Sequence, residues 1–251
     1  MKPFKFKQFT ILQDQCGMKI GTDGVLLGAW AAINHNPYSI LDIGAGTGII
    51  SLMLAQRSHA ENIEAIEIDD SAYEQCTGNF ENSPWRDRLF CFHAGFDEFV
   101  DESKEDDFEE KYDLIVSNPP YFLAPKPSLP TAPLPERENS DSRKKARFHD
   151  SLPFNELVEG VSKILSNDGV FSLIVPFAEE ENIITLSASY QLFPKRITRV
   201  KGNSTTEIKR SLLEFTFNKT DISINELIIE KERHQYTEAY INLTKDFYLK
   251  M

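Results

Sequence analysis

The sequence has few cysteines and a small share of glycine and proline. Its three cysteines, Cys16, Cys76 and Cys91, show no paired spacing. This argues against a disulfide framework or a zinc cluster and fits a reducing compartment. Glycine and proline, 12 and 13 of the 251 residues, are too few for a collagen-like or low-complexity chain. We therefore predict a cytoplasmic globular protein without a metal site.

No segment is apolar for long enough to cross a membrane. The longest apolar run, residues 25–33, is far below the roughly 18–20 residues that a span requires. The first ten residues also lack the apolar core of a signal peptide. The sequence therefore predicts a protein that is neither secreted nor membrane-spanning.

Basic residues are outnumbered, with 27 Lys and Arg against 39 Asp and Glu and a formal net charge of −12. Such a balance ordinarily disfavours a nucleic-acid partner. The imbalance is local, however, because residues 61–113 hold 18 acidic and only 4 basic side chains. The basic residues elsewhere cluster in three groups: Lys2, Lys5, Lys7 and Lys19; Arg143, Lys144, Lys145 and Arg147; and Lys195, Arg196, Arg199, Lys201, Lys209 and Arg210. These groups are either solvated surface charge or a face that holds a polyanion.

Strand-like and helix-like segments alternate along most of the chain. Short apolar runs predict strands at 39–43, 63–68, 89–92, 114–116, 170–175 and 212–217. Apolar residues at helical spacing predict helices at 49–57, 72–82, 154–165, 183–190 and 236–249. This alternation implies crossover connections and a parallel sheet. We predict an α/β fold with a doubly wound, mostly parallel sheet of about seven strands and helices on both faces.

The whole chain, residues 1–251, is predicted to be one domain. Residues 1–38 would form an N-terminal extension to it. Residues 122–150 contain five prolines and no periodicity, and so long a structureless loop is usually functional or disordered. We predict that they form a loop on the substrate side, and that the acidic segment 101–110 is a solvated loop.

A glycine-rich loop, Asp42-Ile-Gly44-Ala-Gly46-Thr-Gly48, follows the first predicted strand and opens a helix. Backbone N–H groups and the helix dipole can meet a charged ligand there, and glycine allows close approach or a positive φ. The spacing differs from that of dinucleotide-binding loops, and the Lys of a P-loop is absent. Glu67 closes the second predicted strand, where such folds present a carboxylate to the two hydroxyls of a ribose. The loop and this acid predict a site for an adenosyl ligand.

A second motif, Asn118-Pro119-Pro120-Tyr121, ends the fourth predicted strand. Ligands of open α/β sheets bind at this edge. The prolines remove two N–H donors, so that the Asn118 Oδ1 and the Pro119 carbonyl can both accept hydrogen bonds from one planar amino group. Tyr121 offers a face for stacking, an interaction worth roughly 1–3 kcal/mol per base in nucleic-acid sites. This chemistry suits methyl transfer from S-adenosylmethionine to an exocyclic amine or an amide nitrogen.

Taken together, these motifs resemble class I S-adenosylmethionine-dependent methyltransferases of the Asn-Pro-Pro-Tyr type. Further segments are similar to the bacterial tRNA(Val) adenine-N6 methyltransferases, which modify the adenine 3′ of the anticodon. Those segments are residues 21–30, 146–149, 209–215 and 246–249. The resemblance implies tRNA as the partner, with no membrane and no obligate protein partner, and S-adenosylmethionine as the cofactor.

The resemblance also implies roles for individual residues. The catalytic residues would be Asn118, Pro119, Pro120 and Tyr121, which bind and stack the adenine. The cofactor-binding residues would be Asp23, Asp42, Gly44, Gly46, Gly48 and Glu67. Asp23 would lie over the cofactor and Glu67 would hold its ribose. Which of Ala94, Gly95 and Asp97 contacts the cofactor adenine stays open.

Other functions fit parts of the same pattern. A guanine in ribosomal RNA also offers an amino group. A glutamine side chain in a translation factor offers an amide, but enzymes of that kind usually carry an N-terminal helical domain, and only 41 residues precede Asp42. A DNA adenine methyltransferase would need a target-recognition module for which the chain has little room. Outside enzymes, the chain could be a non-catalytic cofactor-binding or RNA-binding module, against which the intact Asn-Pro-Pro-Tyr motif argues.

Overall fold

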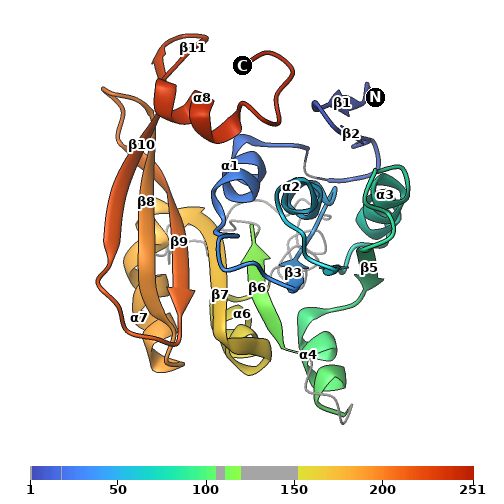
Figure 1. The fold of residues 1–251 in the computed structure, drawn as a ribbon. Coiled ribbons are helices and arrows are strands. Elements are labelled where there is room, and N and C mark those ends of the chain that lie inside the picture. Colours follow the sequence, from blue (N-terminus) through green and yellow to red (C-terminus); the bar gives the residue numbers. More distant parts are fainter. Residues whose placement is uncertain (1, 18, 106–110, 120–151) are drawn as a thin grey trace, which may run out of the picture.

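The computed structural model describes residues 2–17, 19–105, 111–119 and 152–251, and a sheet of nine strands forms its centre (Figure 1). Across the sheet these strands are β11 (Gln235–Tyr236), β10 (Ser223–Glu232), β8 (Phe193–Asn203), β9 (Ile208–Thr216), β7 (Leu165–Pro176), β6 (Tyr112–Ser117), β3 (Ser39–Ile43), β4 (Asn62–Glu67) and β5 (Leu89–His93). A separate hairpin pairs β1 (Phe4–Lys5) with β2 (Thr10–Ile11).

Most neighbouring strands of the sheet are parallel. The parallel set runs from β7 through β6, β3 and β4 to β5. β9 is antiparallel to both β7 and β8, and β10 returns parallel to β8. The predicted doubly wound, mostly parallel sheet is therefore confirmed. It holds two strands more than the seven predicted, because β10 and β11 extend it beyond β8.

Helices cover both faces of the sheet, as predicted (Figure 1). One apolar core lies under α1 (Thr22–Trp30), α2 (Ile49–Arg57), α3 (Asp70–Glu81) and α8 (Glu238–Thr244). The other lies under α4 (Phe96–Glu105), α6 (Phe154–Ile164) and α7 (Glu180–Ser189), which follows a short 3₁₀ turn, η1 (Phe177–Glu179). None of the helices within the described ranges is long and apolar enough to span a bilayer.

Two predictions need correction, the loop at 101–110 and the helix at 236–249. Residues 101–105 belong to α4 instead of a loop, because Phe96 and Val100 are buried at helical spacing, while Asp97, Glu98, Asp101 and Glu102 are exposed. Residues 106–110 lie outside the described ranges. The helix predicted over 236–249 is shorter, since α8 ends at Thr244 and Phe247 packs from the turn that follows.

Close packing of α1 on α2 places the start of α2 at the edge of the sheet. Gly24 and Gly28 face α2, and a Cβ atom on them would lie 3.2 Å from Ile49 Cγ2 and 2.8 Å from Met53 Sδ. A side chain at Gly28 would therefore force the helices apart. Because Ile49 directly follows the glycine-rich loop, this contact helps to hold that loop in place.

Candidate cofactor and amine-binding site

The two predicted motifs meet at one edge of the sheet. In the parallel ladder, Ile43 pairs with Ile66 on β4 and with Ser117 on β6. The Ser117 hydroxyl also donates to the Ile43 carbonyl at 3.0 Å. The carboxyl ends of β3, β4 and β6 are thus neighbours, which brings the glycine-rich loop, Glu67 and Asn118 together, as predicted for a ligand site in this fold.

The glycines of the loop adopt the backbone conformation that favours glycine. Gly44, Gly46 and Gly48 have φ values of 73°, 56° and 75°, all in the left-handed region. A Cβ on Gly44 or Gly46 would meet no atom within 4 Å, whereas a Cβ on Gly48 would lie 2.5 Å from Phe80 Cε1 and 2.8 Å from Cys76 Sγ. The first two glycines leave room on the loop, and the third lets α2 pack on α3.

Glu67 ends β4 and braces the loop. Its Oε2 accepts a hydrogen bond from Gly46 N at 2.8 Å, and its Oε1 accepts one from Asp69 N at 3.0 Å. Each carboxylate oxygen has lone pairs for further donors. The side chain is therefore held in position by backbone groups and retains acceptor capacity of the kind that vicinal hydroxyls require.

Asp42 is wholly buried beneath the loop. Its Oδ2 accepts from the Ser51 N–H at 3.2 Å and the Ser51 hydroxyl at 2.7 Å, while Oδ1 has no hydrogen-bond partner among the described residues. Burial raises the pKa of Asp42 to about 6. A buried carboxylate oxygen without a partner is costly, which makes it a fitting acceptor for a ligand donor or a bound water.

The described part of the second motif is Asn118 and Pro119. Asn118 is half-buried directly after β6, and Pro119 is buried. Pro120 and Tyr121 lie outside the described ranges, so the predicted stacking on Tyr121 stays a prediction. The position of Asn118 beside the loop agrees with a role at the amine, and its catalytic role likewise stays a prediction.

Asp23 lies near the loop but is engaged in an ion pair. Arg210 on β9 donates through Nε to Asp23 Oδ2 at 2.8 Å. The next residue, Gly24, packs on Ile49 at the start of α2. Asp23 therefore joins α1 to β9 close to the loop, and its predicted contact with the cofactor is not tested.

Most of the third basic group is neutralised by acidic side chains. The acids lie on β9, α7, β10 and α1, in the pairs Lys195–Glu214, Arg196–Glu214, Arg199–Glu180, Lys201–Glu226 and Arg210–Asp23. Of the six residues, only Lys209 has no acidic partner within the described ranges. This group is therefore not the open cationic face that its composition suggests. The group at 143–147 lies outside the described residues.

Sequence reasoning missed two polar residues that fasten the N-terminal segment beside the site. Asn79 exchanges hydrogen bonds with the Leu12 backbone, both at 2.9 Å, and also donates to the Thr47 carbonyl of the loop at 2.9 Å. Gln75 accepts from Gln15 N at 3.0 Å. Gln75 and Asn79 are both buried and lie four residues apart on α3. Their spacing places two amide side chains on one face of the predicted helix, and this pattern is the sequence signal that could have identified them.

Cys16 indicates where the N-terminal segment lies relative to Glu67. Burial raises the pKa of the Cys16 thiol to about 11, with further contributions from Glu67 and Asp69. Residue 16 therefore lies close to Glu67, although a thiol with so high a pKa is unreactive at neutral pH. No cluster of three or more metal-ligating side chains occurs in the described part of the chain.

Comparison with known proteins agrees with this geometry. Residues 25–128 match the Methyltransferase small domain family. The chain is 56% identical to a tRNA1(Val) (adenine(37)-N6)-methyltransferase of Flavobacterium psychrophilum, over 99% of this chain and 100% of the relative. It is 41% identical to a protein of the same name from Bacteroides fragilis, over 99% and 98% of the two chains.

Among solved structures, the fold is similar to that of a predicted O-methyltransferase from Agrobacterium tumefaciens. The TM-score is 0.67 at 20% sequence identity, over 90% of this chain and 96% of the other. At that identity the likeness concerns the fold alone.

Proposed function

Because the chain belongs to the tRNA1(Val) (adenine(37)-N6)-methyltransferase family, we propose that it methylates the exocyclic N6 of an adenine in tRNA. The methyl donor is S-adenosylmethionine, and the target is the adenine 3′ of the anticodon of tRNA(Val). The cytoplasm, where tRNA is available, is the proposed location. The observation that carries the proposal is the pairing of Ile43 with Ser117, which places the glycine-rich loop beside Asn118.

The residues around the loop fit the cofactor. Gly44 and Gly46 border open space, so its methionine part can approach the backbone there. Asp42 Oδ1, buried and without a partner among the described residues, suits the cofactor's ammonium group directly or through a water. Glu67, held by Gly46 N and Asp69 N, suits the ribose hydroxyls. When bound, S-adenosylmethionine supplies an electrophilic methyl group on a positively charged sulfur.

Asn118 and Pro119 would hold the amine. The Asn118 Oδ1 and the Pro119 carbonyl each accept one N–H of the adenine amino group, which directs the nitrogen lone pair toward the methyl carbon. With S-adenosylmethionine bound beside it, this nitrogen would receive the methyl group as S-adenosylhomocysteine leaves, and it would release one proton to solvent. Positioning of this kind can contribute several kcal/mol, up to about 7–11. No ionised general base is needed.

The test is methyl transfer from isotopically labelled S-adenosylmethionine to total tRNA, followed by mass spectrometry of the nucleosides. We expect label in N6-methyladenosine from tRNA(Val). Label in N2-methylguanosine of ribosomal RNA would identify a guanine as the substrate instead of the tRNA adenine. Label in a protein glutamine would identify that side chain as the substrate. Cofactor binding without transfer to any of them would contradict the proposal.

A further inference from the structure

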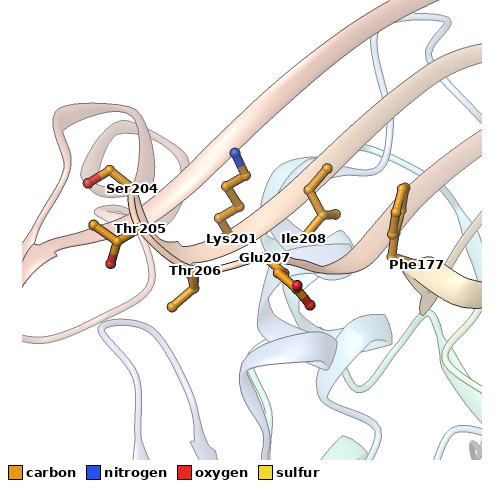
Figure 2. Close-up of a pocket in the computed structure, with 7 residues that line it drawn as sticks. All are labelled: Phe177, Lys201, Ser204, Thr205, Thr206, Glu207 and Ile208. Carbon is orange, nitrogen blue, oxygen red and sulfur yellow. The ribbon is translucent and has the colours of Figure 1, made fainter.

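A pocket lies on the same edge of the sheet as Asn118, at the hairpin between β8 and β9. Its volume is about 510 Å³, and it is lined by Phe177, Lys201, Ser204, Thr205, Thr206, Glu207 and Ile208. In Figure 2, Phe177 stands at one end and Ser204 and Thr205 at the other, with Lys201 and Ile208 between them. The pocket is a shallow depression that is largely open to solvent, which suits a flat ligand that stays partly exposed.

Strand pairing places this pocket on the substrate side. β7 runs parallel to β6, and Pro176 at its carboxyl end pairs with Arg210 near the start of β9. The hairpin between β8 and β9 therefore projects from the edge where β6 ends at Ser117. Three strand steps of about 4.8 Å separate β6 from β8, and the hairpin also extends about four residues of about 3.3 Å beyond the level of Asn118, because Ser117 pairs with Leu173 whereas Arg210 pairs with Pro176. The pocket therefore lies about 20 Å from Asn118. A few nucleotides of a single strand bridge such a distance.

Phe177 presents a partly exposed aromatic ring that is in contact with Arg199. Its side chain is 37% exposed, and the Arg199 guanidinium lies 5.5 Å from the ring centroid. Arg199 is in turn held by the buried Glu180, which accepts from its Nη2 at 2.7 Å and its Nε at 3.1 Å, and Ser211 donates to the same carboxylate. The contact with Arg199 limits the motion of the exposed ring, which reduces the entropy lost when a flat ligand stacks on it.

The charge of the lining favours a base over a phosphate. Among the described residues, Lys201 and Glu207 are the only charged ones that line the pocket, and Lys201 is already paired with Glu226 at 2.8 Å. A site without surplus positive charge does not attract a phosphate group. Instead it offers an aromatic face, the aliphatic Ile208, an ammonium donor and a carboxylate acceptor, which together match the face and the polar edge of a nucleobase.

We propose that this pocket binds a nucleobase of the tRNA strand close to the target adenine and thereby sets the position of the substrate. This inference rests on the proposed function. Phe177 stacks on the base, and Lys201 and Glu207 contact its edge. Phe177 is thus a positioning residue, because it acts on where the RNA lies and not on the reacting atoms.

The test compares Phe177→Leu with Phe90→Leu, the same change at an exposed phenylalanine on β5 at the opposite end of the sheet. Steady-state kinetics with an unmodified tRNA(Val) transcript give KM and kcat, and fluorescence anisotropy gives the Kd of the transcript. Loss of base stacking is expected to raise KM and Kd about 5- to 100-fold in Phe177→Leu. The kcat at saturating tRNA and the Kd of S-adenosylmethionine stay within twofold.

Phe177→Trp separates stacking from a general effect on the fold, because it keeps an aromatic face and should keep KM within a fewfold of wild type. If the wild-type protein methylates tRNA but Phe177→Leu has an unchanged KM, the inference is wrong and the proposed function stands. Equal losses in Phe177→Leu and Phe90→Leu, or failure of Phe177→Trp to restore KM, also overturn it. If the wild-type protein transfers no methyl group to tRNA, the proposed function fails and the inference fails with it.

Discussion

The two halves of the sheet treat their charged side chains in different ways. In the half formed by β3, β4 and β6, the carboxylates of Asp42 and Glu67 are held by N–H and O–H donors and by no basic side chain within the described ranges. In the half formed by β7, β8, β9 and β10, Glu180 and Glu214 are buried against the arginines of β8. The first half retains carboxylate oxygens that can accept hydrogen bonds from a ligand. In the second half, the buried carboxylates form ion pairs with arginines of the same half.

This contrast shows that charge counted along a sequence is not charge presented to a partner. Arg196 donates to Glu214 at 2.6 Å and to the Trp30 carbonyl at 2.9 Å, with its guanidinium 3.7 Å from the Trp30 ring centroid. Such a residue ties β8 to α1 and is not available to RNA phosphates. The proposed contact of this half with RNA therefore depends on its exposed Phe177 ring and the β8–β9 hairpin more than on its arginines.

The largest expected effect comes from breaking a buried pair in the second half. Arg199→Met should lower the free energy of unfolding by about 3–5 kcal/mol, because it leaves the Glu180 carboxylate buried without a counter-charge. The matched control is Lys163→Met, which breaks the exposed pair with Glu159 on α6 and should cost less than about 1 kcal/mol. Urea unfolding measures both, and equal losses would remove the distinction between the two kinds of pair.

Within the first half, the free-energy cost of substituting a loop glycine should depend on how tightly that glycine is packed. Gly48→Ala should destabilise the protein by about 2–4 kcal/mol, since a left-handed φ costs about 1–2 kcal/mol and the new methyl group overlaps Phe80 and Cys76. Gly44→Ala meets open space and should cost only the backbone term of about 1–2 kcal/mol. Urea unfolding without cofactor measures both losses of unfolding free energy. A larger loss in Gly44→Ala than in Gly48→Ala would contradict the prediction.

The catalytic role of Asn118 gives a kinetic prediction. Asn118→Ala should reduce single-turnover methyl transfer at least about tenfold, equivalent to about 1.4 kcal/mol, because one acceptor of the amino group is lost. The Kd of S-adenosylmethionine should stay within a fewfold. Asn225→Ala on β10, where the asparagine is exposed and bonds to Ser223, is the control. A normal single-turnover rate in Asn118→Ala would falsify the assigned role.

The smallest expected effect is a pH dependence that originates at Asp42. Because burial raises the pKa of this carboxyl to about 6, it ionises as the pH rises from 5 to 7, and the charged form attracts the cationic cofactor. The affinity for S-adenosylmethionine should rise across this window by up to about tenfold. Isothermal titration calorimetry measures it, and Asp42→Asn should bind with an affinity that does not change over the same window.

Without cofactor, the same group affects stability with the opposite sign. A carboxyl whose pKa is higher in the folded state stabilises the protein most below its unfolded pKa, and the contribution is lost as the pH rises to about 6. Urea unfolding should show wild type losing stability relative to Asp42→Asn between about pH 4 and pH 6. A constant difference between the two proteins over that window would contradict the assigned pKa.

Much of the first half could be read from the sequence because its signals are local. The strand before Asp42, the three glycines and the helix at 49–57 follow one another directly, and the structure confirms each of them. β8 was not predicted because its two buried apolar residues, Ile197 and Val200, are three positions apart, pack on opposite faces of the sheet and stand among basic residues, so the strand shows no apolar alternation. β10 was missed for a similar reason, since most of its side chains are exposed or half-buried.

The sequence by itself determined the strand, loop and helix around Asp42, and it indicated that Gly44, Gly46 and Gly48 allow either close approach of a ligand or a positive φ; the structure shows the positive φ at all three. These features depend on residues within a few positions of one another and on the sterics of φ. Only the tertiary structure decided that Ser117 lies beside Ile43 and that Arg199 and Arg210 face acids on other elements. The order of strands in the sheet sets those neighbours, because it brings together residues that are far apart in the chain.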